Sequence, residues 1–447
     1  MKKVLFVCIL LLSACVVFAG GVAEETVGDD YTLPENVKAA GTVTFWHAMS
    51  GSKTALIDNY AKEFMEIHPE ITIEPVYCGS YAETVTKGLA AIKAGKPPVI
   101  LQSYEVSTQT MLDSGAIIPV YKLNKGEFDF STISSPIAKY YSVNGNLYSM
   151  PFNSSTAMLY YNKDMFRAAG LDPDDPPTTF DEVYEDSKKI MEAGLASGGI
   201  SFGWPAWIFE QMFAYHNTYY ANNENGRNGQ RASEMLFNSD LGVRVMTEWQ
   251  RWAKDGVLSY GGRNYAANDP FIAGQFPMLI QSTSSLAGII KSADFEVGTA
   301  VLPCIPGYEK GNSVIGGASL WLLKGHSDEV NAAAWEFLQY LSDEENAVAW
   351  HKNTGYFPVN KDAYDTLMTE GWFDKDPRFR TAFDQILGGS DSTAAQGVRL
   401  GNFVEIRDIV SVAIEDIVVN MEDPKTTLDE AKVRCDQVLS DYLSTVE

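Results

Sequence analysis

Cysteine and histidine are scarce in this sequence, and their scarcity argues against two classes of protein. The five cysteines are Cys8, Cys15, Cys78, Cys304 and Cys435, and the first two lie in an apolar stretch at the N-terminus. The other three have neither the spacing of a zinc site nor the even number of a disulfide framework. The five histidines are scattered, with no pair at helical i, i+4 spacing. We therefore expect free thiols, no metal and no cofactor.

Basic residues are few as well, and the chain carries a formal charge of −24 from 34 Lys and Arg against 58 Asp and Glu. Proteins that bind nucleic acid present a basic surface to the phosphate backbone, so this composition argues against nucleic acid as a partner. The segment Gly51-Ser52-Lys53-Thr54 lacks the glycines of a phosphate-binding loop, and no dinucleotide-binding glycine motif follows an expected strand. These absences favour a binding protein over an enzyme.

The one long apolar run stands at the N-terminus, directly after two lysines. A basic start followed by a short apolar segment is typical of a secretory leader, and about 15 apolar residues are too few to span a bilayer well. We expect a signal peptide over residues 1–19, cleaved after Ala19, and a polar spacer over residues 20–40. The sequence Leu-Ser-Ala-Cys that ends at Cys15 offers the alternative of a lipoprotein box, which would leave this cysteine acylated. Either route places the mature protein in the periplasm or otherwise outside the cytoplasm.

Beyond the spacer, apolar residues recur with the periods of strands and of helices. Strands are expected over residues 42–46, 71–77, 98–101, 157–161, 276–280 and 318–323. Helices are expected over residues 54–67, 81–94, 180–193 and 327–341. A last helix is expected to begin at a capping box formed by Thr427 and Glu430. Strands and helices alternate in the first part of the chain, which is typical of a parallel sheet covered by helices, so the fold class is α/β.

Several segments resemble one family, in the same order along the chain. Residues 101–106 (LQSYEV), 151–156 (PFNSST) and 159–164 (LYYNKD) are similar to segments of the extracellular solute-binding proteins of carbohydrate ABC importers. Other segments are similar to the members that bind sn-glycerol-3-phosphate: residues 45–49 (FWHAM), 203–208 (GWPAWI), 315–321 (IGGASLW), 354–358 (TGYFP) and 399–402 (RLGN). The resemblance extends from about residue 42 to about residue 442.

The resemblance implies a two-lobed periplasmic binding protein of type II, with mixed sheets flanked by helices and three hinge crossings. It places the crossings near residues 155–158, 297–303 and 353–358. The N-terminal lobe is then expected to comprise residues 41–155 and 305–352, and the C-terminal lobe residues 156–304 and 353–447. A ligand in the cleft between the lobes would favour closure through contacts that it makes with both lobes at once.

The resemblance also assigns nine ligand-binding residues to this chain. They are Tyr81, Glu105, Ser155, Trp204, Trp207, Ser282, Gly317, Tyr356 and Arg407. A phosphate needs a guanidinium, hydroxyl donors and backbone N–H groups. The resemblance assigns these roles to Arg407, to the serines and tyrosines, and to Gly317. The two tryptophans are expected to pack on the carbon skeleton of the ligand and to limit the size of its head group.

Glu105 is assigned to the hydroxyls of the glycerol moiety. Because a carboxylate repels a phosphate, Glu105 is expected at the opposite end of the ligand from Arg407, in a crevice of positive bias. Without the resemblance, the ordinary interpretation of Arg407 is an exposed helix arginine paired with Glu405 or Asp408. Arg399 is the second candidate for the cation that binds the ligand.

These inferences predict a solute-binding component of an ABC importer that captures sn-glycerol-3-phosphate and delivers it to a permease, and not an enzyme. The alternative ligands are a glycerophosphodiester such as glycerophosphocholine, or a neutral sugar. A more distant alternative is an exported hydrolase or lyase that acts on polyols, for which Glu105 offers only one of the two carboxylates expected. The expected partners are the small ligand and the permease subunits, and the protein is expected to be a monomer.

Overall fold

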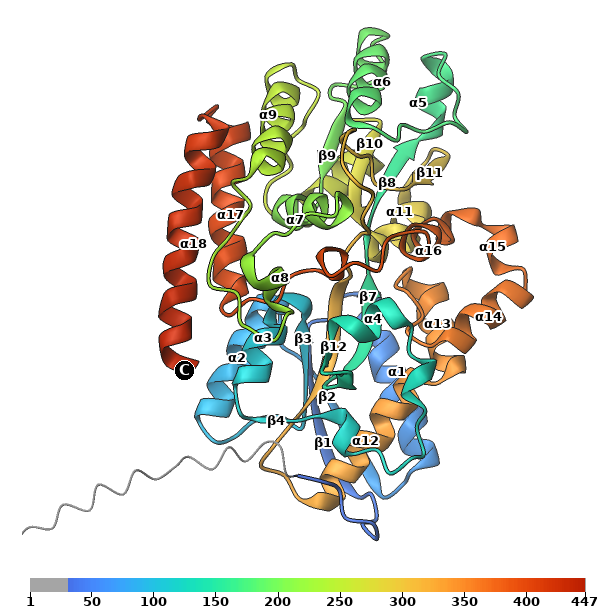
Figure 1. Ribbon diagram of the computed structural model, residues 1–447. Coiled ribbons are helices and arrows are strands. Elements are labelled where there is room, and N and C mark those ends of the chain that lie inside the picture. Colours follow the sequence, from blue (N-terminus) through green and yellow to red (C-terminus); the bar gives the residue numbers. More distant parts are fainter. Residues whose placement is uncertain (1–30, 447) are drawn as a thin grey trace, which may run out of the picture.

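A computed structural model describes residues 31–446 of the chain (Figure 1). The predicted signal peptide, both of its cysteines and the first part of the predicted spacer lie outside the described residues. The described chain forms two large sheets, one above the other in Figure 1, with helices around them. The α/β class predicted from the alternation of strands and helices is confirmed.

The first sheet contains six strands in the order β2-β1-β3-β12-β4, with β7 paired to β12 outside this path. The strands are β1 (Gly41–His47), β2 (Ile71–Tyr77), β3 (Ile100–Tyr104), β4 (Ile117–Ile118), β7 (Met150–Ser155) and β12 (Gly316–Leu323). β1 is parallel to β2 and β3, whereas β12 is antiparallel to β3, β4 and β7. Parallel neighbours need crossover connections, and α1 (Ser52–Ile67) and α2 (Tyr81–Lys93) provide them.

The second sheet contains four strands in the order β11-β8-β10-β9. The strands are β8 (Ala157–Asn162), β9 (Ile200–Phe202), β10 (Met278–Ser282) and β11 (Val297–Ala300). β10 is antiparallel to β8 and parallel to β9, so this sheet is also mixed. Every residue of β8 and β10 is buried. Strands that are covered on both faces have largely apolar sequences without alternation, and these two segments have such sequences.

The chain passes between the two sheets at three places. β7 ends at Ser155 and β8 begins at Ala157, so Thr156 alone separates a strand of one sheet from a strand of the other. The second passage lies between β11 and β12. The third follows α13 (Glu344–Thr354), because α16 (Thr381–Leu387) then packs against β8 and β11. The residue limits proposed for the two lobes remain a prediction.

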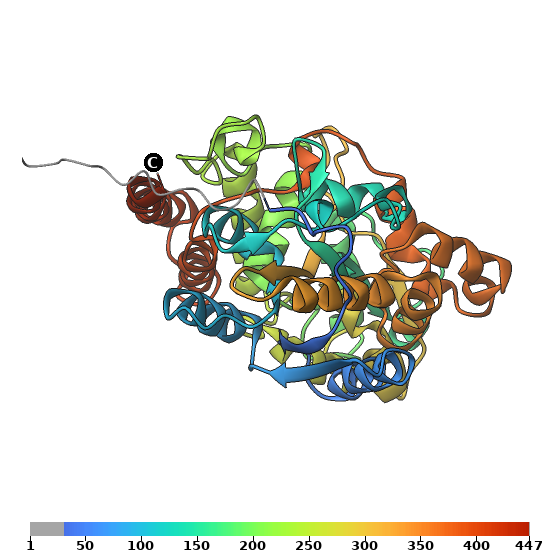
Figure 2. The ribbon, with the colours of Figure 1, turned by 90° about the horizontal axis from the view of Figure 1, so that it is seen from below.

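The other helices surround the sheets, and a short hairpin of β5 (Ser142–Val143) and β6 (Asn146–Leu147) stands apart from them. These helices are α3 (Thr108–Asp113), α4 (Ser135–Tyr140), α5 (Lys163–Ala168), α6 (Phe180–Glu192), α7 (Pro205–Tyr215), α8 (Asn222–Gly226), α9 (Asp240–Lys254), α10 (Asn268–Ile272), α11 (Leu286–Ser292), α12 (Asp328–Ser342), α14 (Lys361–Thr369), α15 (Trp372–Lys375), α17 (Phe403–Val418) and α18 (Pro424–Val446). α17 and α18 lie side by side along one flank, both in Figure 1 and in Figure 2. α17 also packs against α7 and α9, which joins the C-terminal segment to the helices near the second sheet.

The prediction for the start of the last helix is wrong. α18 begins at Pro424, before the expected capping box at Thr427. A carboxylate oxygen of Asp423 accepts a hydrogen bond from the backbone N–H of Thr426 at 2.9 Å, so this aspartate caps the helix. An aspartate followed by a proline is itself a helix-start signal, and it takes precedence over the weaker signal farther along.

The three cysteines of the described residues are free, as predicted, with Cys78 and Cys435 buried and Cys304 half-buried. No helix among residues 31–446 combines the length and the apolar character that crossing a membrane requires.

Candidate ligand-binding site

A cleft of about 340 Å³ opens between the two sheets. Strands β3, β7 and β10 lead into it with their carboxyl ends, and α7, α17 and β12 complete its walls. In open α/β folds, ligands bind in crevices at the carboxyl ends of strands, which makes this cleft the candidate site. All nine residues predicted to bind the ligand line this one cleft.

The nine residues come from segments that are far apart in the sequence. Tyr81 is the first residue of α2, and Glu105 directly follows β3. Ser155 and Ser282 are the last residues of β7 and β10. The tryptophans stand at the start of α7, Gly317 lies on β12, Tyr356 follows α13, and Arg407 lies on α17. The fold therefore brings together every residue that the resemblance singled out.

Arg407 holds two carboxylates at once. Its Nη1 donates to Glu105 Oε1 at 2.7 Å, and its Nη2 donates to Glu210 Oε2 at 2.6 Å. The side chain of Arg407 is 14% exposed, and those of Glu105 and Glu210 are 6% and 4% exposed, so water screens these ion pairs only weakly. The guanidinium lies 4.9 Å from the centroid of the Phe403 ring. Its remaining N–H, at Nε, is buried and has no partner among residues 31–446.

The ionic cluster raises the pKa of both Glu210 and Arg407, which favours the neutral form of the carboxyl group and the charged form of the guanidinium. Burial raises the pKa of Glu210 to about 7, although the charge of Arg407 opposes this shift and that of Glu105 adds to it. Burial alone would lower the pKa of Arg407, but its two carboxylate partners more than offset this, and its pKa lies above the ordinary value. Arg407 is therefore charged at any physiological pH, whereas Glu210 titrates near neutrality.

Two expectations about Arg407 are wrong. Glu105 does not lie apart from Arg407 but is its direct partner. A buried guanidinium without a counter-charge is strongly unfavourable, which explains why the fold sets a carboxylate on it. The ordinary alternative is wrong too, because Arg407 is only slightly exposed and does not pair with Glu405 or Asp408.

The expected positive bias of the crevice is not found either. Its charged lining residues are Glu105, Asp408, Arg263 and Arg407, so two carboxylates balance two guanidinium groups. Arg263 is further paired with Glu415, whose Oε2 accepts from its Nε at 2.8 Å. The lining is thus close to neutral, and the buried carboxylate of Glu210 adds negative charge when it ionises.

Tyrosine hydroxyls meet at one wall of the cleft. The hydroxyl of Tyr81 accepts a hydrogen bond from Asn153 Nδ2 at 2.6 Å and lies 3.4 Å from the hydroxyl of Tyr356. The ring of Tyr81 stacks on that of Tyr104 with centroids 5.3 Å apart and planes 5° from parallel. This wall offers hydroxyl groups to a polar ligand and ring faces to an apolar or cationic one.

Both predicted tryptophans stand at the N-terminus of α7. Trp204 caps the helix with φ 57° and ψ 62°, a left-handed conformation that is unusual for so large a side chain. Trp207 follows three residues later, and its indole N–H is buried without a partner among the described residues. Its ring lies so close to Gly316 of β12 that a Cβ at that glycine would stand 2.6 Å from Cζ2. A glycine at this position therefore allows α7 to touch the first sheet.

Gly317 has a structural requirement of its own. Its φ is +91°, and a Cβ at this position would lie 1.9 Å from the backbone oxygen of Asn153 on β7. The pairing of β12 with β7 shifts register between Ala318 and Ser319, one residue farther along the strand. Only glycine fits this close approach of β12 to β7. The packing of the strands by itself therefore accounts for Gly317, whether or not Gly317 contacts a ligand.

Serine hydroxyls also line the cleft. Ser155 is buried where β7 ends, at the first passage between the sheets. The Oγ of Ser282 accepts from the backbone N–H of Ser284 at 3.2 Å and lies 2.9 Å from the Oγ of Ser284. Ser284 also lines the cleft, so the second sheet contributes a pair of hydroxyls.

Sequence reasoning missed Glu210, the second partner of Arg407. It lies on α7, three residues after Trp207, and residues at this spacing share one face of a helix. That spacing is the signal that could have identified it. Arg399, the second candidate cation, does not line this cleft but a different one.

Comparison with known proteins agrees with this geometry. The family described as bacterial extracellular solute-binding protein matches residues 59–381. The sn-glycerol-3-phosphate-binding periplasmic protein UgpB of Shigella flexneri serotype 5b (strain 8401) is 38% identical over 415 residues, which cover 91% of this chain and 94% of that protein. The protein of the same name from Rhizobium meliloti (strain 1021) is 37% identical over 413 residues, which cover 91% and 96%. This chain belongs to the bacterial extracellular solute-binding proteins.

Solved structures of this class have the same fold. The crystal structure of UgpB from Mycobacterium tuberculosis in complex with glycerophosphocholine has a TM-score of 0.78 at 22% identity, covering 91% of this chain and 100% of that chain. The cyclic α-maltosyl-1,6-maltose binding protein from Arthrobacter globiformis has a TM-score of 0.73 at 20% identity, covering 90% and 100%. The two-lobed type II architecture expected of the chain is confirmed.

Proposed function

We propose that this solute-binding protein captures sn-glycerol-3-phosphate in the cleft around Arg407 and delivers it to the permease of an ABC importer. The observation that carries the proposal is the convergence of all nine predicted residues on one cleft between the two sheets. Curated relatives named for sn-glycerol-3-phosphate binding, 35–38% identical over more than 90% of the chain, support the choice of ligand.

The cleft offers hydrogen-bond donors to a phosphate, and the charge of the cleft itself can change. Arg407 retains an N–H at Nε that no described residue uses, and Ser155 and Ser282 supply hydroxyls nearby. A phosphate monoester carries a charge of about −1.5 to −2 at pH 7. Its approach to Arg407 would favour the protonated form of Glu210, whose pKa is already near 7. Protonation would remove one of the two negative charges that compete for the guanidinium.

A second candidate ligand is a glycerophosphodiester with a cationic head group. The balanced charge of the lining suits a zwitterion, and the stacked rings of Tyr81 and Tyr104 offer faces for a quaternary ammonium. The related structure that contains glycerophosphocholine supports this candidate. Trp204 and Trp207 line the same cleft and would limit the room for a bulky head group.

Nothing in the cleft points to catalysis by the distant alternative, a hydrolase or lyase. Glu105 and Glu210 form a carboxylate pair, but both are engaged by the same guanidinium. The sequence from Gly199 to Gly203 has the spelling of a nucleophile elbow, yet Ser201 is buried within β9 and donates to the backbone oxygen of Ser259 at 2.5 Å. We infer capture without chemical change.

The family is extracellular, and its curated relatives here are periplasmic proteins. We further propose that a signal peptide over residues 1–19 exports the chain. Acylation of Cys15 would give the alternative form of the mature protein. We also propose that a monomer docks on the permease, with no nucleic acid as a partner.

Titration calorimetry with three ligands tests the proposal. Glycerol-3-phosphate is expected to bind with one-to-one stoichiometry, and maltose is expected to give no heat of binding. Glycerophosphocholine in the same series separates the two candidate ligands. The variant Ser155→Ala should weaken the binding of the phosphorylated ligand about tenfold through loss of one charge-assisted hydrogen bond. Ser131→Ala, on an exposed segment outside the cleft, is the matched control. Binding of maltose but of neither glycerophosphate compound would refute the proposal.

A further inference from the structure

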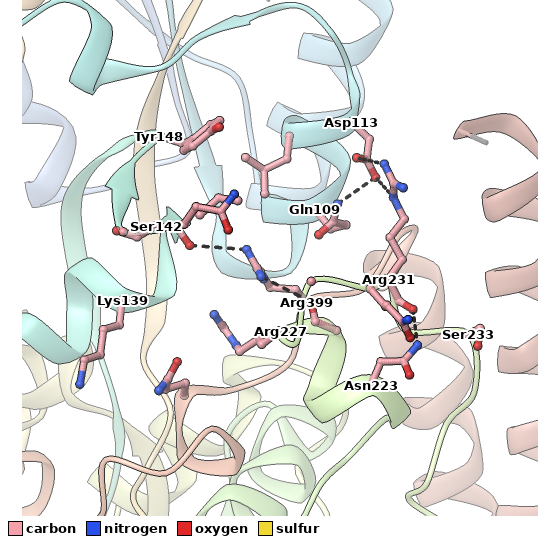
Figure 3. Close-up of a pocket in the computed structure, with 18 of the residues that line it drawn as sticks. Gln109, Asp113, Lys139, Ser142, Tyr148, Asn223, Arg227, Arg231, Ser233 and Arg399 are labelled. Atoms are coloured by element: carbon pink, nitrogen blue, oxygen red, sulfur yellow. Dashed lines mark hydrogen bonds and ion pairs between the residues drawn. The ribbon is translucent and has the colours of Figure 1, made fainter. Parts of the chain in front are cut away.

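A second and larger cleft lies beside the first, with Tyr140 between them. Its volume is about 1090 Å³, against about 340 Å³ for the first cleft. The hydroxyl of Tyr140 lies 3.3 Å from the backbone oxygen of Glu105, and its ring lies 4.8 Å from the guanidinium of Arg227 on the other side. Figure 3 shows the second cleft, with the side chains of Arg227 and Arg399 next to each other.

The lining of this second cleft is cationic, although the whole chain is acidic. Its charged lining residues are one carboxylate, Asp113, and four basic residues, Lys139, Arg227, Arg231 and Arg399. Arg231 is paired with Asp113 at 2.7 Å. Lys139 is paired with Asp391 at 3.0 Å. Arg227 and Arg399 form no direct ion pair with any residue in the range 31–446, and the carboxylates of Glu210 and Asp113 act on them only from farther away.

Backbone oxygens satisfy the two guanidinium groups only in part. The Nε of Arg227 donates to Gly397 O at 2.6 Å, but its Nη2 is buried without a partner among the described residues. Arg399 reaches Ser142 O and Gly226 O at 3.5 and 3.4 Å, and its buried Nε has no partner there either. A buried donor without an acceptor is costly, so an oxyanion that the two side chains turned to meet would offset this cost.

The two arginines also disfavour each other. Burial, and then the positive charge of Arg399, lowers the pKa of Arg227, and burial lowers that of Arg399. Both groups are therefore less favourable as cations here than in water. An oxyanion placed between them would offset the repulsion and accept hydrogen bonds from both planar forks.

A strained turn holds Arg227 in this position. The residues of α8 before it, Asn223, Glu224, Asn225 and Gly226, have φ values of 52°, 53°, 61° and 71°, a left-handed run that is unfavourable for L-residues. The backbone N–H of Arg399 donates to Asn225 O at 2.9 Å, which ties the turn to the segment that carries the second arginine. At Gly226 a Cβ would lie 2.5 Å from Arg399 O, so the close approach needs glycine. Strain of this kind persists where the surrounding structure enforces it, and it is concentrated at functional sites.

We propose that the second cleft binds a phosphate group, free or carried on a small polyol, through the guanidinium groups of Arg227 and Arg399. Neutral polar side chains complete the lining and would contact the rest of an ester, among them Gln109, Asn144, Gln396 and Asn223. Gln109 and Asn144 fall within the predicted N-terminal lobe, whereas both arginines fall within the predicted C-terminal lobe. An occupant would therefore bridge the two lobes and favour their closure. The inference does not depend on which ligand fills the first cleft.

Calorimetric titration of the full chain with inorganic phosphate, and separately with glucose 6-phosphate, tests this inference. Arg227→Gln and Arg399→Gln are each expected to weaken the binding of phosphate at least about tenfold, because each removes charged hydrogen-bond donors. Arg244→Gln, which changes an exposed arginine outside both clefts, should leave the affinity unchanged. Tighter binding of the ester than of free phosphate would identify the ester as the occupant, and the reverse order would identify the free ion.

Ser155→Ala, in the first cleft, distinguishes the two sites. If phosphate affinity falls with Ser155→Ala and persists in both glutamine variants, phosphate binds only the first cleft and the inference is overturned. Absence of phosphate binding to the wild-type chain at millimolar concentration would overturn it as well. Circular dichroism verifies that each variant folds. Where a glutamine variant does not fold, the lysine variant at the same position replaces it. Lysine keeps the positive charge but lacks the planar guanidinium that can donate two parallel hydrogen bonds, so weaker binding of phosphate is still expected.

Discussion

Replacing Glu210 by glutamine tests the ionic cluster that organises the first cleft. Burial raises the pKa of Glu210 to about 7, whereas its ordinary value is 4.5. At pH 5 the folded protein therefore holds a proton at this residue that most unfolded chains have released, and at pH 8 neither state holds it. The proton stabilises the folded state at low pH, and this stabilisation is lost as the pH rises through 7.

The size of the effect follows from the two pKa values. Between pH 5 and pH 8 the contribution of Glu210 to the free energy of unfolding should fall by about 2.5 kcal/mol. Glutamine keeps the shape of the side chain but does not titrate in this range. The free energy of unfolding of the wild type minus that of Glu210→Gln should therefore fall by the same amount over these three pH units.

Urea unfolding followed by tryptophan fluorescence at pH 5, 6, 7 and 8 measures this difference. Glu192→Gln, which makes the same substitution at the exposed end of α6, is the matched control. If the curves of the wild type and Glu210→Gln run parallel from pH 5 to pH 8, Glu210 does not titrate near neutrality. The charge adjustment proposed for ligand binding would then be refuted too.

Gly317→Ala should lower the free energy of unfolding by about 2 kcal/mol or more, because alanine is strained at φ 91° and its Cβ would meet Asn153 O; an unchanged urea midpoint would contradict this. Burial lowers the pKa of His351 to about 4 from 6.5, so the folded protein should lose up to about 3 kcal/mol of stability as the pH falls through this window. His351→Gln should flatten the acid limb of the stability curve, and an unaltered limb would count against it. Gly316→Ala should weaken ligand binding about tenfold, since its Cβ displaces the ring of Trp207 at a cost of about 1–3 kcal/mol; calorimetry that shows equal affinity would exclude this coupling.

The resemblance carried by short motifs was sufficient to place nine residues that the fold gathers into one cleft. Those motifs lie next to strand ends and helix starts, where the direction of the chain is determined locally, so their positions transferred well. The resemblance did not reveal what surrounds Arg407. Glu210 has no motif of its own, and its role depends on α7 crossing α17, a contact between segments almost 200 residues apart.

Local patterns in the amino-acid order were enough for the α/β class and for six of the strands, β1, β2, β3, β8, β10 and β12, whereas the nine residues at the cleft came from the family resemblance. Hydrophobic periodicity and the positions of glycine and proline act over a few residues, so these signals can be interpreted without knowledge of the fold. The charge of the cleft, the pairing of Glu105 with Arg407 and the second cationic cleft around Arg227 and Arg399 emerged only when distant segments were placed in space. Electrostatic free energy depends on distance and on exclusion of water, and neither quantity is written in the order of the residues.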